Sequence, residues 1–176
     1  IKQVATLIRE RKLHDAALLA GELAPPQADC FTSGTPATVR RQVSQTVTVA
    51  NALGRTPTLV IYNVPGRDCS QYSSGGAATD ADYRAWIDGV VSGLGPGKAV
   101  VVVEPDGLAN LPRDCAGAYP GQDVDALTAG RLADIKYAAD TLESGAPNAS
   151  IYLDAGNSAW QNVGEITRRL LLADVN

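Results

Sequence analysis

Three aspartates lie at or just after the ends of three apolar segments of the sequence. The segments cover residues 58–62, 98–104 and 149–154, and the aspartates are Asp68, Asp106 and Asp154. A single Asp after a strand more often forms a turn or caps a helix. Parallel strands, in contrast, end at one edge of a sheet, where they would bring the three acids together. Neighbouring carboxyl groups push their pKa values apart, so one can stay protonated near neutral pH as the general acid that glycoside hydrolysis needs.

Polar and aromatic residues accompany these acids in the same loops. Arg67 directly precedes the first aspartate. Residues 74–76 contain two glycines, whose wide choice of backbone conformations suits either a mobile flap or a surface turn. Trp160 would stack against a sugar ring or pack within its own loop. Trp86 lies on an apolar helix face, so we expect it in the core.

The three cysteines and the single histidine limit other chemistry. Cys30, Cys69 and Cys115 have no CxxC spacing and His14 is the only histidine, so we expect no metal site. The cysteine count fits either three inert buried thiols or one disulfide with a free thiol. A bridge between Cys69 and Cys115 would tie the first two acid-bearing loops together and add roughly 4 kcal/mol in the chain-entropy model. Cys30 would then be a free thiol, buried in an early strand.

Length and composition favour one globular domain and disfavour several functions. The chain has 176 residues, 45% of them hydrophobic and 19% charged, enough for a core but not for two full-sized domains. A net charge of −4 argues against nucleic acid as a partner. No apolar run approaches the ~20 residues of a membrane span. A nucleotide-binding domain is disfavoured because neither GxGxxG nor a P-loop follows the first strands.

Hydrophobic periodicity predicts the elements that must position the acids. Apolar residues recur at helical spacing over 1–19, 36–53, 80–94, 123–144 and 163–175, and strand-like runs occupy 28–32, 58–62, 98–104 and 149–154. Residues 22–26 are predicted to break the first helix. The alternation of strands and helices predicts a parallel α/β fold. The continuous apolar run at 58–62 is expected where both faces of the sheet are covered.

The order of the motifs resembles glycoside hydrolase family 6, the inverting cellobiohydrolases and β-1,4-endoglucanases. The resemblance rests on five segments, residues 62–69, 73–76, 83–88, 103–106 and 152–160. Their sequences are YNVPGRDC, SSGG, YRAWID, VEPD and YLDAGNSAW. Together these segments span most of the chain and are specific to that family.

The resemblance implies a role for each matched residue. Asp106 corresponds to the general acid, and Asp68 to a second acid that raises its pKa and helps organise water. The matched residues of the substrate cleft are Tyr62 beneath the distorted sugar, Ser74 on a flap that holds the water, Arg67, Asp154, and Trp160 as a sugar platform. Asn157 stands where the family usually has His, which changes the contacts to the neighbouring sugar. Cys69 and Cys115 match the family's first disulfide.

The resemblance also implies a larger architecture and a reaction. The family fold is a distorted, seven-stranded relative of the TIM barrel, and residues 1–176 would be a single domain equal to roughly its N-terminal three-fifths. The family's later strands carry a further Asp proposed as base, a Lys and another stacking Trp, which have no counterpart here. The implied activity is inverting hydrolysis of β-1,4 bonds in cellulose or cello-oligosaccharides by a secreted monomer without metal or cofactor. Endo or exo action depends on loops over the cleft, and a non-hydrolytic glucan-binding relative is the alternative.

Overall fold

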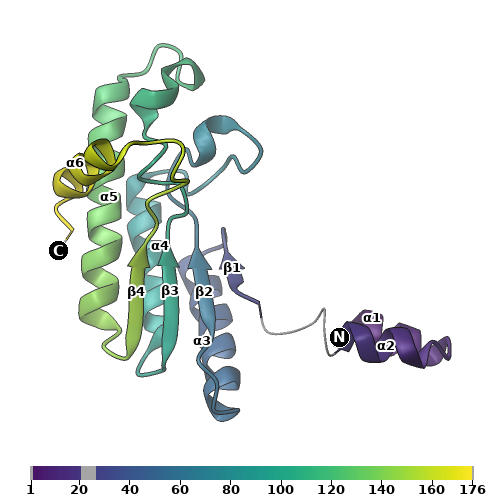
Figure 1. The fold of residues 1–176 in the computed structure, drawn as a ribbon. Helices are drawn as coiled ribbons and strands as arrows, with labels where there is room; N and C mark the ends of the chain where they lie inside the picture. The colour runs from purple at the N-terminus through teal and green to yellow at the C-terminus, as the bar shows by residue number, and fades with distance from the viewer. Residues whose placement is uncertain (1, 21–26, 176) are drawn as a thin grey trace.

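The computed structural model describes residues 2–20 and 27–175. Its centre is a parallel sheet in the order β1-β2-β3-β4, made of Asp29–Phe31, Thr58–Ile61, Ala99–Val103 and Ala149–Leu153 (Figure 1). Successive strands are connected by the helices α3 (Pro36–Ala52), α4 (Asp80–Leu94) and α5 (Val124–Gly145), and α6 (Val163–Ala173) follows β4. The parallel α/β class predicted from periodicity is confirmed.

Side-chain caps determine where the connecting helices begin. The Thr35 side chain accepts a backbone hydrogen bond from the first turn of α3, with Pro36 at the first helical position. Thr79 and Asp123 cap α4 and α5 in the same way. Gly95, with φ of 50°, ends α4. Because these caps are local, the lengths of the loops that precede the helices follow directly from the sequence.

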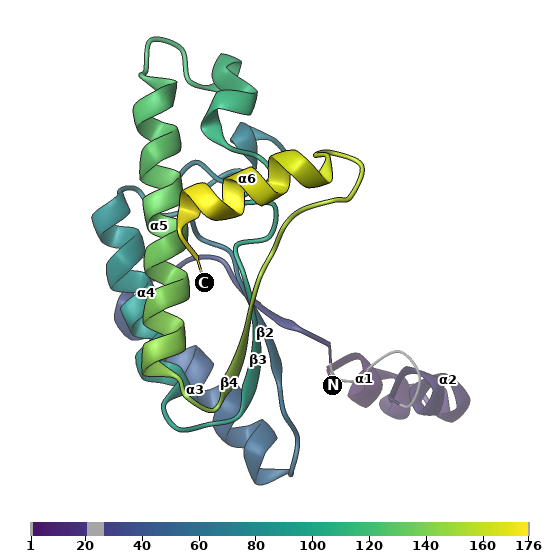
Figure 2. The ribbon, with the colours of Figure 1, turned by 60° about the vertical axis from the view of Figure 1, so that its left-hand side comes forward.

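The three connecting helices lie on one face of the sheet. Figure 2 shows α3, α4 and α5 together on one side of the strands. Alternate strand residues point into the core on this side, among them Leu59, Ile61, Val101 and Val103. Trp86 packs in the same cluster and is 1% exposed, so its predicted core position is confirmed.

The opposite face of the sheet is uncovered by the described residues. Cys30, Val60, Val102 and Tyr152 are in register across the four strands, and all are partly or largely exposed. The prediction that both faces are covered is therefore wrong for the described chain. Cys30 lies in β1 as predicted, but its free thiol is exposed rather than buried because none of the described helices packs on this side.

The N-terminal segment forms two helices instead of the single helix predicted over 1–19. These helices, α1 (Lys2–Arg9) and α2 (Leu13–Leu18), are separated at Arg11, whose φ of 59° interrupts the helical backbone. Residue 1 and the break predicted at 22–26 lie outside the described residues. None of the described helices has the length and apolar character needed to cross a membrane.

Candidate active site

The three predicted acids lie at the carboxyl edge of the sheet. The backbone N–H of Asp154 donates to Val103 O at 3.1 Å, which extends the β3–β4 pairing beyond the strands. The N–H of Asp106 then donates to Asp154 Oδ1 at 2.9 Å, and the N–H of Gly156 donates to the same oxygen at 2.7 Å. The Asp154 carboxylate thus holds both its own loop and the backbone that bears Asp106.

The carboxyl group of Asp106 has a raised pKa. Partial burial is the main cause, followed by the negative charge of Asp154 and then by that of Asp68. Asp106 has φ of 61° and Glu104 has φ of 48°, so the chain makes a tight turn directly after β3. The three sequence-predicted acids thus lie at one edge of the sheet, with Asp154 hydrogen bonded to the Asp106 backbone and the charges of Asp154 and Asp68 both acting on the Asp106 carboxyl group.

Asp68 begins the short helix η2 (Asp68–Ser70) and anchors the segment that follows it. Its Oδ2 accepts a 2.6 Å hydrogen bond from the Ser73 N–H. Arg67 also holds the segment 73–75, because its Nε donates to Ser73 O at 2.7 Å and its backbone pairs with that of Gly75. Ser74 lies between these two attachments with an exposed side chain. The predicted flap is therefore a loop fastened at both sides of Ser74.

Arg67 also supports Tyr62. Its Nη1 donates to the backbone oxygens of Tyr62 and Thr32, and the guanidinium lies 4.9 Å from the centre of the Tyr62 ring. Burial and the charges of Asp68 and Asp106 raise the pKa of Tyr62 to about 12. The phenol therefore stays neutral beside the acids at any ordinary pH.

Asn157 and Trp160 lie in the loop after β4. Asn157 Oδ1 accepts from the Ala159 N–H at 2.8 Å, so its side chain stabilises its own turn. Trp160 is 50% exposed, which leaves part of its indole free for a ligand. Gly156 is required here, since a Cβ would lie 2.2 Å from Ala109 Cβ, and this close packing ties the Trp160 loop to the loop after β3.

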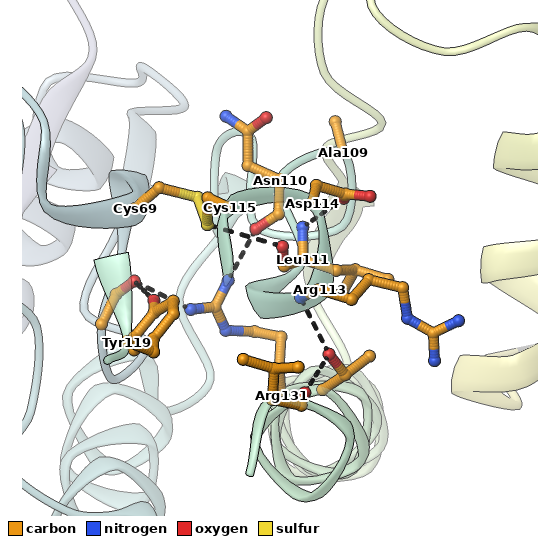
Figure 3. The surroundings of a disulfide bond; sticks show 12 residues. Cys69, Ala109, Asn110, Leu111, Arg113, Asp114, Cys115, Tyr119 and Arg131 are labelled. Atoms are coloured by element: carbon orange, nitrogen blue, oxygen red, sulfur yellow. Dashed lines mark hydrogen bonds between the residues drawn. A yellow bond between two sulfur atoms is a disulfide. The ribbon is translucent and has the colours of Figure 1, made fainter. Parts of the chain in front are cut away.

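A disulfide joins the two loops that carry Asp68 and Asp106. Cys69 of η2 and Cys115 of η3 (Pro112–Ala118) are bonded, with their Cα atoms 5.9 Å apart (Figure 3). The predicted bridge is confirmed. The bond links the short helices η2 and η3. Both acid-bearing loops are therefore restrained covalently as well as by hydrogen bonds.

Two residues of this edge were missed by sequence reasoning. Glu104 is wholly buried and accepts backbone hydrogen bonds from the loop after β2, and Arg131 of α5 donates to both loops. The sequence contained a feature that could have drawn attention to each of these two buried charged residues. Glu104 ends an apolar strand, and Arg131 is spaced four residues from Leu127 and from Ile135 on the apolar side of its helix. Among the described residues, no group of three or more His, Cys, Asp or Glu is arranged to hold a metal ion.

Acids grouped at the carboxyl edge of a parallel α/β sheet, with one pKa raised by burial and by neighbouring acids, are typical of glycoside hydrolases. The chain matches the model of glycosyl hydrolases family 6 over residues 1–175. It belongs to this family, and the resemblance noted in its motifs is confirmed.

Relatives of the chain include endoglucanases and cellobiohydrolases. It is 36% identical over 152 residues to endoglucanase A of Thermobispora bispora, covering 86% of this chain and 32% of the relative. It is 35% identical over 109 residues to a probable 1,4-beta-D-glucan cellobiohydrolase C of Aspergillus clavatus, covering 57% of this chain and 22% of the relative.

A solved structure has the same arrangement of elements. The endoglucanase Cel6 of Mycobacterium tuberculosis, in complex with methyl-cellobiosyl-4-deoxy-4-thio-beta-D-cellobioside, superposes with a TM-score of 0.77 at 39% identity. The match covers 89% of this chain and 50% of that protein. The chain therefore spans half or less of the length of these relatives.

Proposed function

We propose that this chain carries the general acid of a cellulase that hydrolyses β-1,4-glucosidic bonds with inversion. The observation that supports this most directly is the surroundings of Asp106. Its backbone is hydrogen bonded to Asp154, and burial together with the charges of Asp154 and Asp68 raises the pKa of its carboxyl group. A raised pKa keeps a carboxyl group protonated to higher pH, as a general acid requires.

In the proposed reaction, Asp106 gives its proton to the departing glycosidic oxygen. Water attacks the anomeric carbon from the opposite face, so one C–O bond forms as the other breaks and the configuration inverts. The proton of the water leaves through a solvent relay that touches Asp68 and Ser74. The 2.6 Å bond from the Ser73 N–H to Asp68 supports this relay, because it brings the residue next to Ser74 onto the carboxylate.

The other matched residues are proposed to bind substrate. The neutral Tyr62 phenol, held by Arg67 beside the acids, suits a position beneath the distorted sugar. The half-exposed Trp160 suits a stacking platform. Asn157, in the place of the family His, offers a neutral amide near the neighbouring sugar.

The properties of the whole protein are also proposals. The uncovered sheet face and the 50% coverage of the solved endoglucanase support a single domain that is part of a distorted, seven-stranded barrel. The names of the relatives support cellulose or cello-oligosaccharides as the substrate, and include both endo- and exo-acting enzymes. The Cys69–Cys115 bridge supports secretion into an oxidising environment. A monomer without cofactor stays a prediction.

The test is release of reducing sugar from a soluble β-glucan by the complete protein and its Asp106→Asn variant. We expect at least a thousandfold loss of kcat, since the amide N–H groups are far too weakly acidic to protonate the departing oxygen. Glu143→Gln is the matched control, because it removes one carboxylate from an exposed position on α5. Normal activity of Asp106→Asn would contradict the proposal. Binding of cello-oligosaccharides by the wild type with no product would favour the non-hydrolytic alternative.

A further inference from the structure

Residues 63–66 connect Tyr62 to Arg67 and Asp68, and a buried carboxylate holds the start of this segment. Glu104 is 0% exposed. Its two carboxylate oxygens accept from the Asn63 N–H at 3.1 and 3.0 Å, and Oε2 also accepts from the Val64 N–H at 3.0 Å. Glu104 therefore fixes the first two peptide units after Tyr62 to the end of β3.

A buried guanidinium holds the second half of the same segment. Arg131 Nη2 donates to Pro65 O at 2.7 Å and to Gly66 O at 3.1 Å. Its Nη1 donates to Gly107 O and to Asn110 O, in the loop that bears Asp106. Figure 3 shows Arg131 beside Asn110. One side chain from α5 thus bridges the loop after β2 and the loop after β3.

The two charges match the polarity of the backbone that they hold. The carboxylate receives the N–H groups of residues 63 and 64, and the guanidinium supplies donors to the carbonyl groups of residues 65 and 66. Charge-assisted hydrogen bonds are stronger and more directional than neutral ones, above all where water is excluded, and those to Glu104 take on this character as pH rises through its raised pKa of about 7. A well-packed apolar pair would often stabilise a core as well, so the geometry of the loop is the better reason for two buried charges.

We propose that Glu104 and Arg131 are positioning residues that hold the loop bearing Asp68 against the loop bearing Asp106. Both are buried beneath the edge, with exposed fractions of 0% for Glu104 and 5% for Arg131. The groups that face the Asp106 carboxyl are Asp154, Asp68 and the Tyr62 phenol. Those that face Glu104 are Tyr83 from α4 and Arg131 from α5. Loosening residues 63–66 would release Asp68, whereas Asp154 would stay bonded to the Asp106 backbone.

The first measurement needs no variant. Hydrogen exchange of the wild-type protein should show the Asn63 and Val64 amides exchanging at least a hundredfold more slowly than the amide of Thr56, which lies in an exposed loop. Exchange of the two amides as fast as that of Thr56 would overturn the proposal, because the Glu104 hydrogen bonds would then not persist.

The second measurement is the pH profile of kcat for Glu104→Gln in the complete protein. The amide keeps one acceptor but turns an N–H2 group toward the loop, so we expect faster exchange at residues 63 and 64 and a roughly tenfold to hundredfold lower kcat. The alkaline limb should move to lower pH, because Asp106 loses the nearby charge of Asp68. A wild-type kcat and alkaline limb, or a change in KM alone, would overturn the proposal.

Arg131→Lys provides an independent variant. It keeps the positive charge but cannot span the two loops, and we expect the same direction of change in kcat, in the alkaline limb and in exchange. The inference rests on the proposed function, and its failure is separable from failure of that function. If the wild type shows no hydrolytic activity, the proposed function is contradicted and the exchange measurement still tests the inference. If the wild type is active but the kinetics of Glu104→Gln and Arg131→Lys are unaltered, only the inference is contradicted. Glu143→Gln serves again as the control.

Discussion

The backbone N–H of Asp106 and the Oδ1 atom of Asp154 are joined by a 2.9 Å hydrogen bond across 48 residues of sequence. The bond orients the turn that bears Asp106, and the charge of Asp154 contributes to the raised pKa of the Asp106 carboxyl group. One side chain therefore controls both the position and the acidity of the proposed general acid. The contact also joins β3 to β4 at the point where both strands end.

Asp154→Asn should move the alkaline limb of kcat to lower pH. The amide oxygen still accepts the Asp106 N–H, but the negative charge that raises the pKa of Asp106 is gone, so the acid loses its proton at lower pH. Asp154→Ala should lower kcat further, because it also loses the hydrogen bond. The check is a pH–kcat profile on soluble β-glucan. An alkaline limb at the wild-type pH in Asp154→Asn would contradict this account of the acidity.

Loss of the disulfide should destabilise the fold. Cys69 and Cys115 are 46 residues apart, so replacing both by Ser removes up to about 4 kcal/mol of the free energy of unfolding in the chain-entropy model. Urea unfolding under non-reducing conditions measures the change. Cys30→Ser is the matched control, since this thiol is exposed and unbonded and its loss should leave stability unaltered. Equal midpoints for the double variant and the control would refute the prediction.

Stability should fall as pH rises from about 5 to 8. Burial raises the pKa of Glu104 to about 7, so the folded protein binds more protons than the unfolded chain over this range. The stabilising contribution of protonated Glu104 is complete below its unfolded pKa and is lost as pH rises through 7. Asp134, whose pKa burial raises to about 6, acts in the same direction. Urea unfolding at several pH values measures the slope, which Glu104→Gln should flatten. A free energy of unfolding that increases between pH 5 and 8 would exclude this effect.

Trp160→Ala should weaken sugar binding without changing stability. The indole is half exposed, so its removal leaves the core intact but deletes a stacking surface worth about 1 kcal/mol, or roughly fivefold in Kd. Calorimetric titration of the complete protein with cello-oligosaccharides measures the change. Leu171→Ala, which truncates another exposed apolar side chain, should bind as the wild type does. Undiminished affinity in Trp160→Ala would remove this residue from the proposed cleft.

Local sequence signals predicted most of the elements correctly. Helix caps such as Thr35, Thr79 and Asp123 act within one turn, so they are readable without a fold. The parallel α/β class follows from the alternation of such helices with apolar strands. The cysteine count left both a disulfide and three free thiols open, and the bridge between Cys69 and Cys115 was the alternative that the family resemblance favoured.

The N-terminal helices show the limit of periodicity. Apolar spacing over residues 1–19 is compatible with one helix, yet the backbone is interrupted at Arg11. Periodicity reports which face of a helix is apolar, and does not report a single residue with a positive φ unless that residue is Gly or Asn.

The sequence by itself determined the class of fold, the three acids and the order in which the strands deliver them, because these depend on short-range propensity and on chain direction. Tertiary structure decided which face of the sheet is covered, and therefore that Cys30 is exposed, since a run of valines fits a covered face and an open face equally well. It also decided the roles of Glu104 and Arg131. The partners of each lie between 21 and 66 residues away in the chain, and a buried charge is stable only where such distant backbone groups converge on it.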